Sequence, residues 1–134
     1  MKILIVEPFR RPRRAEIPHT LEAMQHVVGG CIQAIYPFDD LVALVCDDEG
    51  KLKGYDLNRY IPEVDIIAGT FFVCGLGEED FTDLPDDLAD KYEKLFYYPQ
   101  IFFRSAKGII ALSADGREVE VKLRSWQMIP SCFR

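Results

Sequence analysis

Four arginines around a proline are the residues of this sequence best suited to hold phosphate groups. Each carries a planar guanidinium, which can bind phosphate oxygens through two parallel hydrogen bonds. The arginines are Arg10, Arg11, Arg13 and Arg14. Phe9 beside them could stack on a base. Such a segment cannot pack in a core, so we expect an exposed loop or hairpin tip, and a solvated turn without a ligand is the alternative.

Acidic side chains in the middle of the chain form a second candidate surface. Residues 39–93 carry sixteen acidic and four basic side chains, whereas the two flanking parts are net basic. The candidate partner-binding acids are Asp39, Asp40, Asp47, Asp48, Glu78, Glu79 and Asp80. Charges of one sign steer association with an oppositely charged partner. These acids could bind a basic protein surface or imitate nucleic-acid phosphates, and a solvated rim is the alternative.

The sequence offers no recognisable catalytic or metal-binding set. It contains neither G-x-G-x-x-G nor a glycine-rich loop ending in Lys-Ser or Lys-Thr. His19 and His26 do not have the i, i+4 spacing of a metal pair on one helix face. The four cysteines form no C-x-x-C pair, and the apolar neighbours of Cys31, Cys46 and Cys74 favour core thiols. We therefore expect a protein without enzymatic activity, cofactor or metal, with a small enzyme of unknown reaction as an alternative.

Length and composition are those of one globular domain. The 134 residues are 49% hydrophobic and carry a net charge of −6. The negative charge disfavours general binding to nucleic acid, although an accessory nucleic-acid-binding protein that uses the arginine segment is an alternative. No apolar run is long enough to cross a membrane, and the apolar run in Met1–Pro8 is too short for a signal peptide. We therefore expect a cytoplasmic protein.

Hydrophobic periodicity predicts several strands and one helix in the first half of the chain. Thr20 can cap a helix over residues 21–28, and Gly29-Gly30 can end it. The predicted strands comprise residues 2–6, 15–17, 31–36, 41–46 and, after an acidic turn, a short return strand at 51–53.

The second half predicts one central strand and a second helix. Residues 54–60 show neither helical nor strand periodicity, so we expect an ordered loop there. Residues 65–74 are apolar on both faces, which predicts the central strand of the sheet. The segment 78–96 is an acidic lead into a helix with Pro85 at its first position. The side chains expected to face inward are Leu88, Tyr92, Leu95 and Phe96.

The last third predicts strands joined by a tight turn. Strands are expected at residues 101–103, 108–113 and 118–126, and the Asp-Gly turn at 114–117 indicates a β-hairpin. The predicted fold class is therefore α+β: a single small domain over residues 1–134, with a mostly antiparallel or mixed sheet, two helices and a C-terminal β-hairpin.

The order and spacing of several short segments resemble those of a known family. The segments are Met1–Pro8, Leu21–Gln25, Val28–Gly30, Leu57–Arg59, Asp65–Val73 and Glu79–Asp83. Together they resemble the family catalogued as domain of unknown function 3846, which comprises small proteins of phages, plasmids and other mobile elements of Firmicutes. The resemblance covers residues 1–96, so residues 97–134 would be a C-terminal extension. The family carries no assigned enzymatic activity.

The resemblance implies a protein of a phage or mobile element, where small accessory proteins frequently act against host defence. We expect a binding protein that either covers a host defence protein with its acidic face or sequesters a cyclic or ADP-ribose-type nucleotide. In the second form, Asn58 and Arg59 would hold phosphates together with the arginine tip, between protomers of a homo-oligomer. Because Arg59 lies in an irregular polar segment, we expect it to be exposed and Arg59→Ala to leave folding intact.

Overall fold

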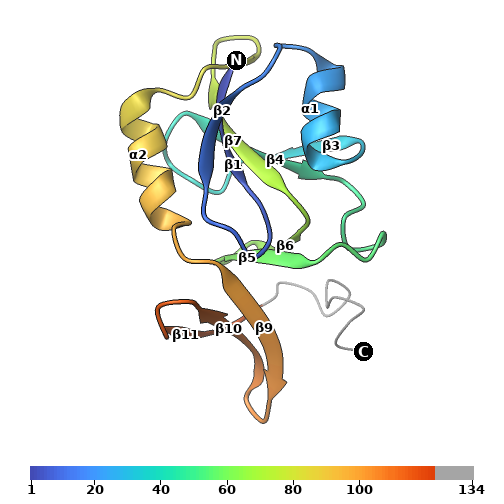
Figure 1. Cartoon of the computed structure of the whole chain (residues 1–134), viewed down its shortest axis with the longest axis vertical. Helices are drawn as coiled ribbons and strands as arrows, with labels where there is room; N and C mark the ends of the chain where they lie inside the picture. Colours follow the sequence, from blue (N-terminus) through green and yellow to red (C-terminus); the bar gives the residue numbers. More distant parts are fainter. Residues whose placement is uncertain (123–134) are drawn as a thin grey trace.

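A six-stranded antiparallel sheet forms the centre of the fold (Figure 1), in a computed structural model that describes residues 1–122. Its strands are β1 (Lys2–Val6), β2 (Arg13–Glu16), β3 (Ile32–Ile35), β4 (Val42–Asp47), β7 (Phe71–Leu76) and β8 (Phe81–Thr82). The order is β2-β1-β7-β4-β3, and β8 pairs with β7. The three inner strands are apolar on both faces, which explains why they are almost entirely buried.

One helix packs on each face of this sheet. Successive residues of a strand point to opposite faces, so Phe72 of β7 packs with Met24 and Val28 of α1 (Leu21–Val28). Phe71 and Val73 pack on the other face with the buried residues of α2 (Asp86–Leu95). Figure 1 shows the two helices on either side of the sheet. The fold is therefore α+β, with two helices and antiparallel sheets.

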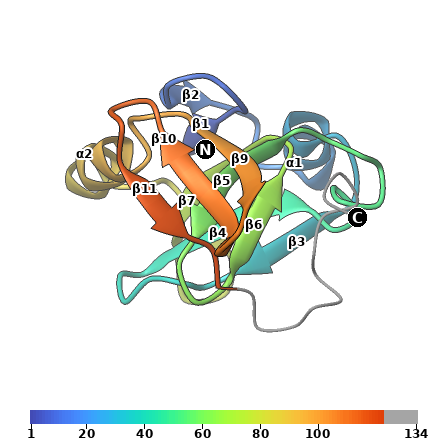
Figure 2. The same ribbon diagram turned by 90° about the horizontal axis from the view of Figure 1, so that it is seen from below.

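Two smaller sheets pack against each other beside the main sheet (Figure 2). The first contains β5 (Leu57–Ile61) and β6 (Asp65–Ala68). The second, the C-terminal sheet, contains β9 (Gln100–Ser105), β10 (Gly108–Ser113) and β11 (Glu118–Glu120). Their shared apolar cluster consists of Tyr60, Ile66, Ile109, Ala111 and Val121. The cluster joins the C-terminal sheet to the rest of the chain.

Both ends of the first helix are as predicted from the sequence. The second helix differs from the prediction at its start and at Leu95. The Thr20 side chain accepts a hydrogen bond from the Ala23 N–H at 3.1 Å, and Gly29 has a left-handed φ of 91°. Pro85 is the residue before α2, not its first helical residue. Leu95 is 55% exposed, so its expected inward position is wrong. Phe96, the next residue, is buried against Phe71 of β7 as expected.

The predicted central strand over residues 65–74 is two strands. The chain changes direction at Gly69, whose φ is 82°, so that β6 pairs with β5 while β7 enters the main sheet. The segment predicted as a loop over 54–60 contains most of β5, and residues 51–53 form a turn instead of a strand. Strand β2 begins at Arg13, two residues earlier than predicted, because its backbone pairs with β1.

The C-terminal sheet is antiparallel throughout the part of the chain that the structure describes. Strand β10 is joined to β11 by residues 114–117, and the portion of the predicted strand beyond residue 122 lies outside the described residues. Neither described helix is long and apolar enough to cross a membrane.

Candidate functional site

Arg59 is buried where three parts of the fold meet. Its side chain lies on β5, and the residue is 2% exposed. Nε and Nη2 donate to the carbonyl oxygen of Phe96, at 3.3 and 2.9 Å, directly after α2. Nη1 donates to Asn58 Oδ1 at 2.8 Å, and Nη2 also donates to the carbonyl oxygen of Arg10 at 2.8 Å. Arg59 therefore joins β5 to the end of α2 and to the β1–β2 connection, residues 7–12, here called the arginine loop.

The charge of Arg59 is balanced by carbonyl groups. No ion pair links it to a carboxylate within residues 1–122. Burial lowers the pKa of its guanidinium to about 10, which leaves it protonated at neutral pH. Carbonyl oxygens at a helix C-terminus carry partial negative charge, and that of Phe96 supplies part of the counter-charge. The expectation that Arg59 is exposed is wrong, because its donors are used inside the fold.

Asn58 is also an internal residue. It is fully buried, and its Nδ2 donates to the carbonyl oxygens of Val6, at 2.9 Å, and Gly69, at 2.8 Å. Its Oδ1 accepts from Arg59. Asn58 thus ties the end of β1 to the turn between β6 and β7. Asn58 and Arg59 lie beneath the arginine loop and do not present free groups to a ligand.

The four arginines of the predicted tip divide into two pairs. Arg13 pairs with Glu7 at 3.0 Å, and Arg14 pairs with Glu93 of α2 at 3.1 Å and with Asp90. The hydrogen bonds that Arg14 donates, first to Asp90 and then to Glu93, raise the pKa of its guanidinium. Arg14 therefore holds the hairpin against α2, whereas the Arg13–Glu7 pair lies within the hairpin.

Arg10 and Arg11 are the exposed arginines of the arginine loop, and neither forms an ion pair with any described residue. Cζ of Arg11 lies 4.7 Å from the centre of the Tyr97 ring, a cation–π distance. The Tyr97 ring in turn contacts that of Tyr98, with centroids 5.0 Å apart. The loop therefore presents two cations, of which that of Arg11 lies over the half-buried Tyr97 ring.

The predicted acidic face is divided between two ends of the main sheet. Strands β4 and β7 are antiparallel, so the loop before β4 lies beside the loop after β7, and the Leu76 N–H donates to the Leu41 carbonyl at 2.9 Å. The residues gathered there, here called the acidic end, are Asp39, Asp40, Glu78, Glu79 and Asp80. Asp47 and Asp48 lie at the opposite end of β4. A single face containing all seven acids is therefore excluded.

Two residues of the acidic end have partners inside the protein. Asp40 accepts from Lys91 Nζ at 2.6 Å and from the Tyr92 hydroxyl at 2.5 Å, and these bonds lower the pKa of its carboxyl. Asp80 lies 3.3 Å from His19 Nε2. Within the acidic end, the exposed carboxylates that form no ion pair with a described residue are those of Asp39, Glu78 and Glu79. They are the acids available to a partner.

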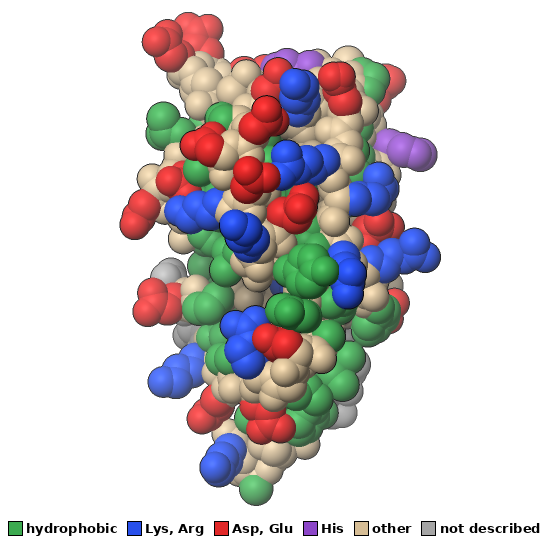
Figure 3. Space-filling model, turned by 60° about the vertical axis from the view of Figure 1, so that its left-hand side comes forward, with side chains coloured by type: hydrophobic (Ala, Val, Ile, Leu, Met, Phe, Trp, Pro, Cys, Tyr) green, Lys and Arg blue, Asp and Glu red, His purple; other side chains and the backbone are tan. Residues whose placement is uncertain are grey.

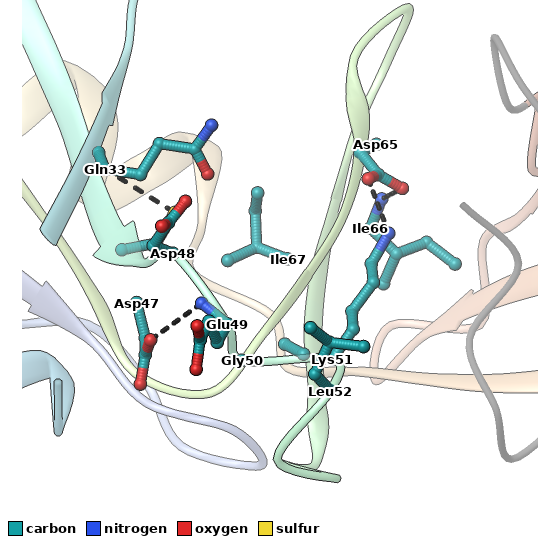
Figure 4. Close-up of a pocket in the computed structure, with 12 residues that line it drawn as sticks. Gln33, Asp47, Asp48, Glu49, Gly50, Lys51, Leu52, Asp65, Ile66 and Ile67 are labelled. Carbon is teal, nitrogen blue, oxygen red and sulfur yellow. Dashed lines mark hydrogen bonds and ion pairs between the residues drawn. The ribbon is translucent and has the colours of Figure 1, made fainter. Parts of the chain in front are cut away.

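An acidic cavity of about 280 Å³ lies at the other end of β4 (Figure 4). Asp47 and Asp65 approach it from two sides, and both are nearly buried. Asp47 accepts from Lys53 Nζ and the Glu49 N–H, both at 2.8 Å. Asp65 accepts from Lys51 Nζ at 2.5 Å. The expectation that Asp47 faces a partner is wrong, and within residues 1–122 no set of three side chains is arranged to hold a metal ion.

A second cavity, of about 180 Å³, lies between the end of α2 and the C-terminal sheet. We call it the aromatic cleft. Phe38, Leu95, Tyr98 and Val119 contribute apolar walls, and the buried Arg59 forms part of its lining. Sequence patterns did not indicate this site, because its walls come from a loop, a helix end and an edge strand that are far apart in the chain.

The geometry defines an α+β protein whose antiparallel sheet carries one helix on each face. The chain belongs to the family described as domain of unknown function (DUF3846), whose model matches residues 1–97. The match ends just before β9, so the C-terminal sheet lies beyond it. The resemblance found in the sequence is confirmed. Neither the curated proteins nor the solved structures include a significant match to the chain.

Proposed function

We propose that the protein is a non-enzymatic binding protein of a phage or mobile element, which acts in the host cytoplasm against a defence system. In this proposal its acidic end binds a basic surface of a host defence protein. The observation that supports it is that the exposed acids Asp39, Glu78 and Glu79 lie on two adjacent loops without an ion pair among the described residues. The mobile-element setting rests on the family resemblance.

The arrangement of the acidic end favours binding for an electrostatic reason. Carboxylates held near one another repel, and a partner's cations relieve that repulsion. The hydrogen bonds that Asp40 accepts from Lys91 and Tyr92 hold one of the two loops against α2. A loop that is already ordered loses less entropy on association.

Charge reversal tests the proposal. The partner is first captured from host lysate and purified, and its dissociation constant is then measured for the wild type and for Glu78→Lys/Glu79→Lys. We expect the variant to bind at least about tenfold more weakly. The matched control is Asp48→Lys/Glu49→Lys, which reverses two adjacent exposed acids at the opposite end of β4. Equal affinity of the first variant and the wild type would show that the acidic end is not the binding surface.

The biological arm is a plating assay. A phage that needs the protein to grow on a host with the defence system should lose that ability with the acidic-end variant and keep it with the Asp48→Lys/Glu49→Lys control. We also propose that the C-terminal β-hairpin, which lies beyond the family match, is an addition specific to this protein's partner. Deleting the hairpin should then change partner choice.

A further inference from the structure

The aromatic cleft has the size and walls of a site for one flat ring. Phe38 and Tyr98 place aromatic side chains along it, and Leu95 and Val119 add aliphatic surface. Its volume of about 180 Å³ is below the range of roughly 300–1,000 Å³ typical of sites for complete drug-sized ligands. It therefore has room for one ring system, and the remainder of a ligand would lie outside.

The lining of the cleft favours an anion. It contains no Asp or Glu among the described residues. Arg59 lies in the wall as a protonated guanidinium without a carboxylate partner there, so it contributes positive potential although its own donors are occupied. Arg117 also lines the cleft and pairs with Asp115 at 2.6 Å. A negative group near the opening would be stabilised by these charges.

Polar groups in the cleft can also recognise a ring edge. The Ser113 hydroxyl accepts a hydrogen bond from Gln100 Nε2 at 3.2 Å, and the Gln100 Oε1 is occupied by the Tyr60 N–H at 2.8 Å. The hydroxyl hydrogen of Ser113 and the second Nε2 hydrogen of Gln100 are therefore donors that a ligand acceptor could use. A heteroaromatic ring with acceptor atoms on its edge fits this arrangement.

The arginine loop lies beside the cleft. Arg59 connects the two directly, because it lines the cleft and donates to the Arg10 carbonyl. A second connection runs through two aromatic rings. Tyr98, which lines the cleft, contacts the Tyr97 ring, and the Arg11 guanidinium lies over that ring. Figure 3 shows hydrophobic side chains gathered in the middle of this face, with Lys and Arg side chains on both sides.

We propose that the aromatic cleft and the arginine loop form a binding site for a free nucleotide. The base enters the cleft between aromatic walls, and the phosphate binds the guanidinium groups of Arg10 and Arg11. Arg59 is a positioning residue of this site, since it fixes the backbone of the loop through the Arg10 carbonyl. The site does not involve the acidic end, so the two proposals can fail separately.

Binding is tested by calorimetric titration of the full chain with AMP, ADP-ribose and cyclic di-AMP, and with a short oligo-dT as the nucleic-acid arm. We expect at least one of the free nucleotides to bind and the oligonucleotide to bind more weakly. Arg10→Ala/Arg11→Ala should weaken nucleotide binding at least about tenfold, because it removes two charge-assisted contacts. Arg13→Ala, which removes an arginine already paired with Glu7, should leave binding unchanged.

The cleft is tested with a matched pair of tyrosine variants. Tyr98 is 40% exposed and lines the cleft, whereas Tyr36 is 61% exposed and does not. Tyr98→Ala should weaken nucleotide binding and Tyr36→Ala should not, with melting temperatures measured to show that both variants fold. Three results would each overturn the proposal: no binding of any free nucleotide, binding of the oligonucleotide alone, or binding that neither Tyr98→Ala nor the double arginine variant weakens.

Discussion

At the scale of single residues, the most informative group is a buried guanidinium that relies on carbonyl oxygens. Arg59 reaches the backbone of Phe96, Asn58 and Arg10. A lysine could not replace it, because an ammonium has three donors around a point charge and lacks the planar fork that spans these oxygens. The residue type is therefore required by the geometry of the junction.

The first prediction concerns the removal of this group. Arg59→Met keeps the aliphatic part of the side chain but leaves several buried carbonyl oxygens without a donor. Each such group costs about 1–3 kcal/mol, so we expect a loss of roughly 3–5 kcal/mol in the free energy of unfolding, measured by urea denaturation. Arg13→Ala, at an exposed arginine, is the control and should cost less than about 1 kcal/mol. An unchanged urea midpoint for Arg59→Met would contradict the internal role.

The cysteines give a second prediction at this scale. Burial raises the pKa of the Cys46 thiol to about 11 and that of the Cys74 thiol to about 12, so neither forms a reactive thiolate at neutral pH. Cys31 is exposed, in contrast to the core position expected from its neighbours. On a Cys132→Ser background, we expect one thiol to react rapidly with Ellman's reagent and two to react only after denaturation. Rapid reaction of all three would show that the core opens.

At the scale of elements, the turn between β4 and β5 depends on a buried carboxylate. Burial acts to raise the pKa of Asp47, but the hydrogen bonds from Lys53 and the Glu49 N–H outweigh it, and the net shift is downward. A carboxyl with a lowered pKa in the folded state stabilises the fold above its unfolded pKa, about 3.9, and loses this effect as pH falls through the folded value.

The urea midpoint should therefore fall as pH decreases below about 4 and change little between pH 5 and 7. Asp40, whose pKa is also lowered, contributes in the same direction. Asp47→Asn should reduce the pH dependence below pH 4 as well as the stability at neutral pH. Asp48→Asn, at the exposed neighbour, serves as the control. An Asp47→Asn profile parallel to that of the wild type would exclude the carboxylate as the source.

The sequence correctly predicted the elements that can be recognised from neighbouring residues alone. The Thr20 cap, the Gly29 end and the apolar strands β1 and β4 all follow from neighbouring residues. Strand β5 could not be predicted in this way, because Asn58 and Arg59 are polar residues typical of loops. Only their hydrogen-bond acceptors in the folded protein explain why they are buried. Those partners come from distant segments, so neither the burial of the pair nor the aromatic cleft could be read from a local pattern.

At the scale of the whole molecule, the β5–β6 sheet packs against both other sheets, through Ile61 and Ile67 on the main sheet and through Tyr60 and Ile66 on the C-terminal sheet, so all three should unfold together. Phe72 is fully buried in the main sheet, and Ile66 is fully buried against the C-terminal sheet. Phe72→Ala should cost about 3–5 kcal/mol and Ile66→Ala about 2–5 kcal/mol. Differential scanning calorimetry should show a single unfolding transition, and its midpoint temperature should fall in both variants. Two transitions, with each variant moving a different one, would reveal independent units.

The spacing of the Arg59 contacts along the chain bears on the order of folding events. Its acceptors Phe96 and Arg10 lie 37 and 49 residues away, so the junction requires β1, β5 and α2 to be in place beforehand. Contacts that form after the rate-limiting barrier slow unfolding without accelerating folding. Arg59 variants should therefore shift the unfolding limb of a chevron plot and leave the folding limb nearly unchanged. By slowing unfolding, Arg59 would give the native protein a longer lifetime against proteases.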